Sequence, residues 1–456
     1  MHTVNGFLII HFRFPIRSLK NSRQDGHNMS IFCAFFFLVF FRNCVNLILG
    51  SAIGKECRKG VNDMELENIL KEILKTSVES SEIAGANFLV IKDGKEMVYV
   101  QAGMADREAG REIKRDTIFR LYSQTKPVTS VAAMILMERG LLDFYAPVSE
   151  FLPSFAQMCV AKTGERIPCT RQILVNDLLN MTSGLVYPDE GTEAGRAADK
   201  VFQEACGRLH SENPMTTREL ADRLATRPLA FEPGSSWAYG TSADILGAVI
   251  EVVSGKRLSE FMREEIFEPL GMKDTAFWVP KEKQSRFAKV YETVEKENGG
   301  KELVLYTGDN LAVCNDMANP PAYEAGGAGL ASTLDDYSRF STMLLNGGSL
   351  NGVQILQPKT VEFFKDGELI PAQQDSFRNW VGLEGYSYGN LMRVCKNPSQ
   401  SGMMTRKGEY GWDGWLGMYF ANFPEENMTI LMGTQKKDGG TFGLTRRLRN
   451  VVLSRV

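Results

Sequence analysis

The stretch LYSQTKPVTS, residues 121–130, places a serine and a lysine three positions apart, Ser123 and Lys126. On a helix, side chains at this spacing lie on one face and within reach of each other. A serine hydroxyl is a weak nucleophile until a base takes its proton, and a partly buried lysine can lose its own proton and act as that base. The chain contains this S-x-x-K spacing once, and a long apolar run follows it. The pair therefore indicates a nucleophile and its base near the start of a helix.

Two later stretches supply further groups for the same chemistry. Tyr239 lies in EPGSSWAYGTSADILG (232–247), just before an expected helix, where its phenol can share a proton with the Ser–Lys pair or protonate a leaving group. GWDGWLG (411–417) begins a strand with glycines, which let a backbone approach a substrate closely. The backbone N–H groups of Ser123 and Trp415 are therefore the expected oxyanion hole. Taken singly, Tyr239 is also typical of a tyrosine whose ring packs in the protein. The stretch 411–417 is likewise typical of an aromatic turn at the edge of a sheet.

Histidine and cysteine usage limits the alternatives. Three of the four histidines precede residue 63, which leaves His210, and no G-x-S-x-G sequence occurs, so a Ser-His-Asp triad has little support. The five cysteines after residue 63 show no C-x-x-C spacing. They predict free thiols in a reducing compartment, with no metal site and no cofactor.

Net charge argues against one class of partner. Residues 64–456 hold 44 Lys/Arg and 52 Asp/Glu, so this part of the chain is acidic. A nucleic-acid-binding surface needs a basic balance, so we expect no nucleic-acid partner. The 456 residues, 43% of them hydrophobic, suffice for one large core or two modest domains.

The order of the expected elements predicts the fold class. A β-rich pair of runs surrounds the Asp93-Gly94 turn (87–103), and a second hairpin is expected at 414–435. Helical patterns fill most of the sequence between them: 123–140, 173–185, 216–229, 242–255 and 258–271. We therefore expect an α/β fold, with an antiparallel sheet from about 64–120 and 380–456, flanked by helices, and an inserted all-α lobe at about 140–330.

Residues 1–63 do not resemble the rest of the chain. IFCAFFFLVFF (31–41) is an eleven-residue apolar run, too short to span a bilayer comfortably. It suits a signal-peptide core, a weak anchor, or translated upstream sequence ahead of a true start at Met64. We favour the last, because residues 64–83 open as an amphipathic helix, and it predicts a cytoplasmic protein. The signal-peptide and anchor interpretations predict a secreted or membrane-anchored protein, with membrane contact only if residues 31–53 are retained.

Together the three motifs and their flanking text resemble the serine β-lactamase and penicillin-binding-protein superfamily, and most closely its class C β-lactamase-like esterases. The resemblance covers residues 64–456, including the stretches 116–153, 178–185, 231–251 and 326–348. It implies that Ser123 is the acylated nucleophile, Lys126 its proton partner and Tyr239 a second general acid and base. It also implies an α/β sandwich with a helical lobe and the site between them.

Two departures from the family pattern bear on the substrate. The family's second motif is usually Tyr-x-Asn, but here Thr241 replaces the asparagine and supplies a hydroxyl in place of an amide. Penicillin-recognising members carry Lys-Thr-Gly or His-x-Gly on the third motif, where this chain has Trp412-Asp413-Gly414. Replacing a cation by an indole beside an acid disfavours carboxylate-bearing β-lactams and favours neutral acyl esters.

The leading function is a serine hydrolase that acts on small-molecule carboxylic esters or related acyl compounds. Tyr122, Trp237, Trp412 and Trp415 suggest an aromatic-walled pocket, although each ring also suits core packing. Alternatives are β-lactamase activity, D-alanyl-D-alanine carboxypeptidase or D-aminopeptidase-like activity, and acyl transfer to an acceptor other than water. A non-catalytic scaffold on the same fold is a further alternative, supported by the missing amide at Thr241.

Overall fold

The computed structural model describes residues 3–4, 7–8, 64–162, 164–296, 299–380, 382–440 and 443–456. The chain divides into two compact units, Met1–Asn62 and Asp63–Val456. In the first unit, strands β1 (Thr3–Val4) and β2 (Phe7–Leu8) pair. The apolar run at 31–41 lies outside the described residues, so its interpretation stays a prediction. Among the helices that the structure describes, none combines the length and the apolar character needed to cross a membrane.

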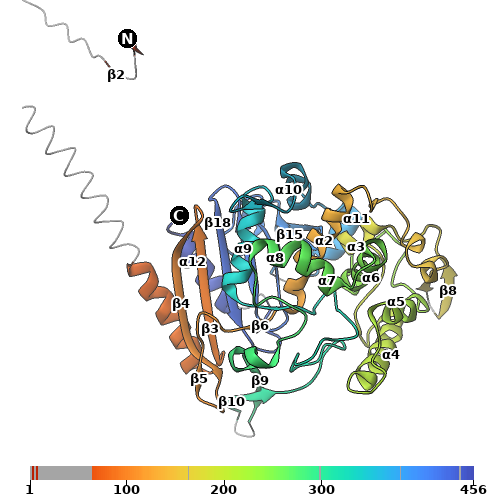
Figure 1. Ribbon diagram of the computed structural model, residues 1–456, viewed down its shortest axis with the longest axis horizontal. Helices are drawn as coiled ribbons and strands as arrows, with labels where there is room; N and C mark the ends of the chain where they lie inside the picture. Colours follow the sequence, from red (N-terminus) through yellow and green to blue (C-terminus); the bar gives the residue numbers. More distant parts are fainter. Residues whose placement is uncertain are drawn as a thin grey trace, which may run out of the picture. The chain divides into compact units, whose positions relative to one another are not determined.

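The second unit is built on an eight-stranded antiparallel sheet of order β14-β15-β16-β17-β18-β3-β4-β5 (Figure 1). The strands are β3 (Gly85–Lys92), β4 (Lys95–Asp106), β5 (Arg111–Glu112), β14 (Tyr386–Gly389), β15 (Met392–Cys395), β16 (Tyr410–Asp413), β17 (Tyr419–Phe423) and β18 (Met428–Thr434). Strand β18 pairs with β3, with Leu431 opposite Leu89, so the two ends of the unit share one sheet. The predicted fold class, an antiparallel sheet made from both ends and flanked by helices, is confirmed.

The hairpin between β3 and β4 follows from its turn residues. Asp93 and Gly94 have φ angles of 53° and 71°, both in the left-handed region. Two such residues make the type I′ turn whose twist matches that of antiparallel strands. Lys92 and Lys95 close the pairing on either side.

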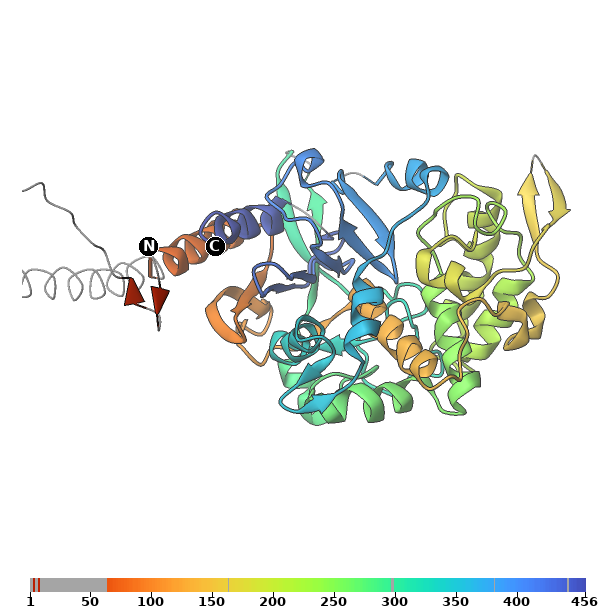
Figure 2. The same cartoon turned by 90° about the horizontal axis from the view of Figure 1, so that it is seen from above.

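Helices cover both faces of the sheet. A helix over residues 64–79 and the C-terminal helix α12 (Gly443–Leu453) pack on one face (Figure 2). On this face Leu70 and Leu448 join Phe88 and Ile430 in a core. Helix α9 (Leu334–Leu345) packs on the opposite face, against β3, β17 and β18. The sheet is therefore buried on both sides, which explains the long apolar runs of its central strands.

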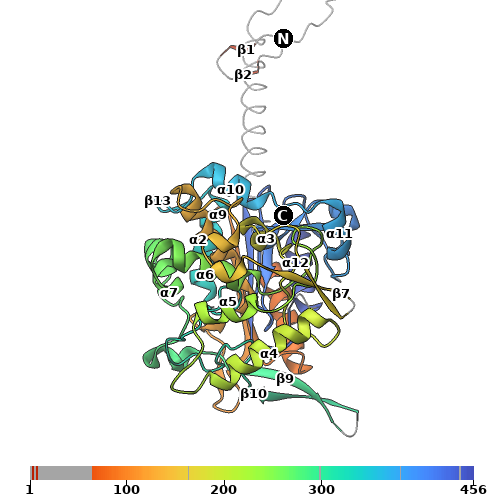
Figure 3. The ribbon, with the colours of Figure 1, turned by 90° about the vertical axis from the view of Figure 1, so that its right-hand side faces the viewer.

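The helical lobe lies at the end of this unit opposite strands β4 and β5 (Figure 1), and Figure 3 views the unit from the side of the lobe. Its helices are α3 (Val175–Asn180), α4 (Glu193–Arg208), α5 (Thr217–Ala225), α6 (Ser242–Ser254) and α7 (Leu258–Met262), which continues through a π-helical turn (Arg263–Phe267) into α8 (Glu268–Leu270). Helix α6 packs against α2 (Lys126–Glu138), and α2 also contacts β16 of the sheet. Helix α2 therefore lies between the lobe and the sheet.

The remaining elements are short. Three small hairpins are β7 (Cys159–Lys162) with β8 (Glu165–Pro168), β9 (Val290–Glu295) with β10 (Lys301–Tyr306), and β12 (Ser349–Leu350) with β13 (Val353–Gln354). Strand β6 (Phe119–Arg120) pairs with β11 (Ala331–Ser332). Helices α10 (Pro358–Lys365) and α11 (Pro371–Phe377) precede β14, and 3-10 turns lie at Val148–Glu150, Pro153–Phe155, Lys281–Arg286 and Pro398–Gln400. Strands β9 and β10 lie in the range expected to be helical and instead pair with each other.

Candidate active site

Ser123 lies on a tight turn that leads from strand β6 into helix α2. The turn is a 3-10 helix over Tyr122–Thr125, and α2 begins directly after it at Lys126. Tyr122 has a φ of 45°, a left-handed backbone that a bulky residue adopts only at a cost of about 1–3 kcal/mol. Pro127 then occupies the first turn of α2, where its fixed φ suits a helix start. The helix expected over 123–140 is therefore two elements, and the serine sits at their N-terminal end.

Lys126 is fully buried, and its Nζ atom lies among neutral oxygen atoms. Nζ is 3.2 Å from Ser123 Oγ, 3.1 Å from Tyr187 Oη and 2.8 Å from the backbone carbonyl of Gly327. A charged amine donates to all three oxygens, and a neutral amine can donate two protons and keep its lone pair for a third partner. A carbonyl oxygen only accepts, so the serine hydroxyl and the Tyr187 phenol are the two groups that can exchange a proton with Nζ.

A buried carboxylate stands behind this lysine without touching it. Asp244 Oδ1 accepts hydrogen bonds from Tyr323 Oη at 2.8 Å and from the Gly327 N–H at 2.9 Å. The two ends of the Gly327 residue thus face Asp244 and Lys126. Burial raises the pKa of Asp244, and the positive charge of Lys126 opposes that rise. Burial, followed by the field of Asp244, also raises the pKa of Tyr187 well above its usual value, so Tyr187 remains a neutral phenol.

Tyr239 shares the same space but has a different hydrogen-bond partner. Its hydroxyl accepts a hydrogen bond of 2.9 Å from the indole Nε1 of Trp412. Lys126 Nζ lies 4.7 Å from the centre of the Tyr239 ring, over its face. The three side chains expected to act together, Ser123, Lys126 and Tyr239, are therefore gathered in one place, although the tyrosine meets the lysine through its ring.

The expected oxyanion hole depends on a close backbone approach at Gly414. A Cβ atom at this position would lie 2.3 Å from the carbonyl oxygen of Leu121, so only glycine fits. Its N–H bonds the Met418 carbonyl at 2.7 Å, which fixes the turn after β16. The N–H of Trp415 has no acceptor among the described residues, and that of Ser123 lies in the first turn of a helix, where N–H groups lack intrahelical partners. Both N–H groups are thus available to an incoming oxygen atom.

A pocket of about 320 Å³ opens beside Ser123. Its lining residues are Ser123, Tyr239, Trp380, Leu383, Trp412, Asp413, Gly414, Trp415, Asp438 and Gly440. Four aromatic rings line it, and no lysine, arginine or histidine is among these lining residues. The Asp438 carboxylate accepts a hydrogen bond of 2.7 Å from the Trp415 indole. The pocket therefore suits an apolar group more than a carboxylate.

Three residues predicted to contact the substrate lie behind the pocket wall instead. Tyr122 is 2% exposed and packs edge-on against Trp415, with ring centres 4.9 Å apart. Trp237 is 6% exposed and stacks on Tyr239. Thr241 is fully buried, and its hydroxyl has no partner among the described residues. The direction of these side chains depends on tertiary packing, which a local sequence pattern does not determine.

Four other residues at the site carried no usable sequence signal, and a fifth, Tyr187, carried an indirect one. Trp380 and Leu383 follow α11 in a stretch without periodicity, and Asp438 and Gly440 follow the last strand. Tyr187 comes two residues after the stretch LLNMTSGL, one of those that carry the family resemblance. Its place beside a recognised segment is the signal that would have drawn attention to it.

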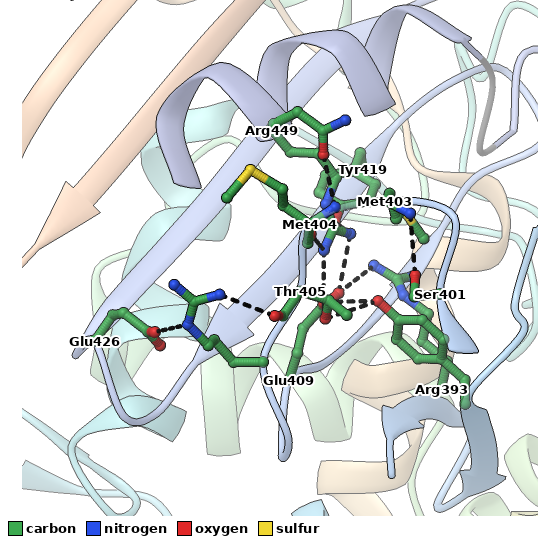
Figure 4. Close-up of polar contacts among 12 residues, drawn as sticks. Arg393, Ser401, Met403, Met404, Thr405, Glu409, Tyr419, Glu426 and Arg449 are labelled. Atoms are coloured by element: carbon green, nitrogen blue, oxygen red, sulfur yellow. Dashed lines mark hydrogen bonds and ion pairs between the residues drawn. The ribbon is translucent and has the colours of Figure 1, made fainter. Parts of the chain in front are cut away.

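Asp413 belongs to the pocket and also contacts a buried ionic network. Figure 4 shows Arg393, Glu409 and Arg449 of this network. Burial raises the pKa of Asp413, but the Arg393 guanidinium, 2.8 Å from Asp413 Oδ1, opposes this rise. Arg393 in turn faces Glu409, which forms an ion pair with Arg449 of α12 at 2.6 Å. Glu409 also accepts a hydrogen bond of 2.7 Å from Tyr386. The network therefore ties the strand that carries the third motif to the C-terminal helix.

His210 takes no part in this arrangement. Its side chain is 65% exposed, and its Nε2 lies 2.7 Å from Asp309 Oδ2. It is not among the residues that line the pocket beside Ser123. The expectation that a group other than imidazole must accept the serine proton is therefore consistent with the geometry.

Comparison with known proteins adds the family. The family model described as Beta-lactamase matches residues 70–453. Esterase EstB of Burkholderia gladioli is 32% identical over 406 residues, which cover 85% of this chain and 95% of that protein. A putative D-alanyl-D-alanine carboxypeptidase of Escherichia coli is 26% identical and is matched over 77% of this chain and 78% of its own. The solved structure of EstCE1, a hydrolase with promiscuous acyltransferase activity, is similar in fold, with a TM-score of 0.71 and 24% identity over 86% of this chain and all of that one.

The chain belongs to the Beta-lactamase family and is a serine hydrolase of the serine β-lactamase and penicillin-binding-protein superfamily. The predicted resemblance is confirmed at this level.

Proposed function

We propose that the protein hydrolyses carboxylic esters or related acyl compounds through an acyl-enzyme on Ser123. One observation carries this proposal: Ser123 Oγ lies 3.2 Å from the buried Nζ of Lys126, and Ser123 lines an aromatic pocket. No lysine, arginine or histidine is among the residues that line this pocket. The pair supports attack on an acyl carbon, and the pocket supports an uncharged acyl group.

The proton transfers follow from the partners of Lys126. The neutral amine donates to the Gly327 carbonyl and the Tyr187 hydroxyl and directs its lone pair at Ser123 Oγ. The serine proton passes to Nζ as Oγ bonds to the acyl carbon. The negative charge that develops on the substrate oxygen is met by the N–H groups of Ser123 and Trp415.

We assign the remaining proton transfers to Tyr239. Its phenol lines the pocket and receives the Trp412 indole N–H, which leaves its own proton free to reach the departing alkoxide. Water then attacks the acyl-enzyme and gives a proton to the Tyr239 phenolate, and the Oγ–acyl bond breaks as Nζ returns the serine proton to Oγ. In this scheme Lys126 and Tyr239 serve as base and acid in turn.

The substrate class follows from the charges on the pocket wall. Both carboxylates that line it, Asp413 and Asp438, are already engaged, by Arg393 and by the Trp415 indole respectively. An anionic substrate would meet these two acids with no lysine, arginine or histidine on the lining to offset them, so its binding carries an electrostatic cost. A neutral ester meets aromatic rings and no such cost.

A second candidate is peptidase or β-lactamase activity, which the similarity to a protein named as a putative D-alanyl-D-alanine carboxypeptidase favours. The similarity to a protein named esterase is stronger and covers more of the chain. Trp412 stands where carboxylate-recognising relatives carry a cation, and we rank the ester function first for that reason.

The experiment is a substrate comparison on one preparation. Initial rates are measured with p-nitrophenyl butyrate, nitrocefin and a D-alanyl-D-alanine peptide, each with the wild type and with Ser123→Ala. We expect kcat/KM for the ester to exceed that for nitrocefin by at least 100-fold, with every rate abolished in the variant. The opposite order would make the second candidate the function, and no serine-dependent turnover of any substrate would support the scaffold alternative.

A further inference from the structure

A second cluster of reactive side chains lies outside the pocket just described. His210, Asp309 and Cys314 each offer one ligand atom, and these three atoms lie within 4.8 Å of one another. His210 follows helix α4 of the helical lobe, whereas Asp309 and Cys314 follow strand β10. Nitrogen, oxygen and sulfur donors from two distant segments therefore converge on one point.

The loop after β10 is shaped to bring two of these donors together. Asn310 and Val313 exchange backbone hydrogen bonds of 3.3 and 3.0 Å, which makes a tight two-residue turn. The turn residues, Leu311 and Ala312, have φ angles of 51° and 55°, a region that non-glycine side chains rarely adopt. Asp309 and Cys314 are the residues that flank this turn, so its closure brings them together.

The carboxylate of Asp309 is oriented before any ligand binds. Its Oδ1 accepts a hydrogen bond of 2.8 Å from the Asn315 N–H, and its Oδ2 lies 2.7 Å from His210 Nε2. The carbonyl of Asn315 accepts hydrogen bonds from the buried Arg120 guanidinium, which anchors the loop to the strand preceding Ser123. Oriented ligands of this kind reduce the entropic cost of binding a metal ion.

A cavity of about 300 Å³ adjoins the cluster, and its lining supplies a fourth donor atom, a carboxylate oxygen. Asp316, which lines it, has its Oδ1 3.2 Å from Cys314 Sγ. Two cations, Arg120 and Lys289, also line this cavity. Arg120 already donates to the carbonyls of Asn315 and Ala288, so its charge is directed at the backbone.

Two simpler interpretations explain less. A surface ion pair between His210 and Asp309 accounts for one contact but not for the thiol beside it. A lone nucleophilic cysteine accounts for the thiol but not for the carboxylate and imidazole oriented beside it.

We propose that His210, Asp309 and Cys314 bind a zinc ion, with Asp316 or a water molecule in the fourth position. Zinc takes imidazole, carboxylate and thiolate ligands in tetrahedral sites. Magnesium and calcium prefer oxygen ligands alone, so the mixed donor set argues against either of these ions. On binding, the Cys314 thiol forms a bond to zinc and releases its proton to solvent. The sequence predicts no metal site, because ligands about a hundred residues apart leave no spacing pattern.

A bound ion would join the helical lobe to the loop that Arg120 anchors. Because the ion binds the folded chain and not the separated segments, it adds to the free energy of unfolding in proportion to the logarithm of its concentration. The proposal is independent of the ester function, since none of its residues lines the pocket at Ser123.

The test uses untagged, reduced, chelator-treated full-length protein, titrated with zinc by calorimetry and with cobalt by absorption spectroscopy. We expect one equivalent to bind, a thiolate-to-cobalt charge-transfer band, and a higher Tm with zinc. Cys314→Ser should remove the band and the Tm rise, and His210→Ala should weaken zinc binding at least 10-fold. Cys169→Ser, a half-buried thiol elsewhere, is the matched control and should bind like the wild type.

The cysteines and histidines of residues 1–63 can also bind metal, so the variants decide the result. Zinc binding and a cobalt band that persist unchanged in Cys314→Ser would overturn the proposal. Absence of stoichiometric binding by the wild type would overturn it as well.

Discussion

Two groups of buried basic side chains have opposite kinds of partners. The first is Lys126, and the second is Arg393 with Arg449. The lysine contacts a serine, a tyrosine and a carbonyl, all neutral. The arginines contact the carboxylates of Glu409 and Asp413. Among the described residues Lys126 has no direct ionic partner, whereas each of the two arginines forms ion pairs with carboxylates.

The pKa directions of the arginine network agree with this difference. Burial alone lowers the pKa of Arg449, but Glu409 and Tyr419 more than reverse that effect and raise it well above its usual value. Burial raises the pKa of Glu409, but Arg449 and Arg393 outweigh it and hold that pKa below the ordinary value. The comparison indicates that the arginine network is built for rigidity, and the lysine cluster is compatible with the proton transfer that we propose for it.

The largest expected effect is on catalysis, from Ser123→Ala. The change removes the nucleophile, and we expect kcat/KM for p-nitrophenyl butyrate to fall by about 10³-fold or more. The melting temperature should stay within about 2 °C, since a half-buried hydroxyl at a helix start contributes little. Ser235→Ala, an exposed serine on another loop, is the control and should retain full activity. Substantial turnover by Ser123→Ala would remove this serine from the mechanism.

The second effect is on stability, from Glu409→Gln. Removing this charge leaves Arg393 and Arg449 underpaired inside the protein, which costs about 3 kcal/mol of unfolding free energy. Urea unfolding measures the loss, and kcat at a temperature where the variant is folded should remain within about threefold of wild type. Glu362→Gln, which breaks an exposed pair with Lys359, is the control and should leave the free energy of unfolding close to that of the wild type. Equal stability of the two variants would refute the structural role.

The third effect separates the two tyrosines beside Lys126. Tyr239→Phe removes the proposed acid and should lower kcat by about 10²-fold. Tyr187→Phe removes a neutral partner of Nζ and should lower kcat by only about 10-fold, since Ser123 and the Gly327 carbonyl still hold the amine. Steady-state kinetics on both variants tests the order. If Tyr187→Phe proved the more damaging, the acid role would pass to Tyr187.

The smallest effect is the acid dependence of stability. The pKa of Glu409 is lower in the folded than in the unfolded chain. Its contribution is therefore fully present above the ordinary carboxyl pKa of about 4.3 and is lost as pH falls through the lower folded value. We expect the unfolding free energy of the wild type to fall more steeply than that of Glu409→Gln below about pH 4. Parallel curves in urea titrations at a series of pH values would show that the network does not hold the charge on Glu409.

Local sequence patterns were sufficient for the fold and for part of the site. Three predicted features depend only on residues that are close in sequence, and the structure has all of them. They are the Asp93-Gly94 turn, the apolar strands β3 and β18, and the S-x-x-K spacing at the start of a helix. The family resemblance added the order of the elements.

What the sequence did not predict depends on contacts between distant segments. Trp380 reaches the pocket from a loop without periodicity, and Thr241 turns away from it because the core surrounds it. Tyr187 bonds Lys126 across 61 positions, and the Arg393–Glu409–Arg449 network links charges that read singly as surface residues.

The most direct test of the account is the rate at which a fluorophosphonate probe modifies Ser123, followed by intact and peptide mass in wild type and Lys126→Met. The methionine fills the lysine's buried space without an amine. We predict rapid single labelling at Ser123 in the wild type and labelling at least 100-fold slower in the variant, with circular dichroism unchanged. Equal labelling rates in the two proteins, or no adduct at Ser123 in the folded wild type, would contradict the claim that Lys126 activates this serine.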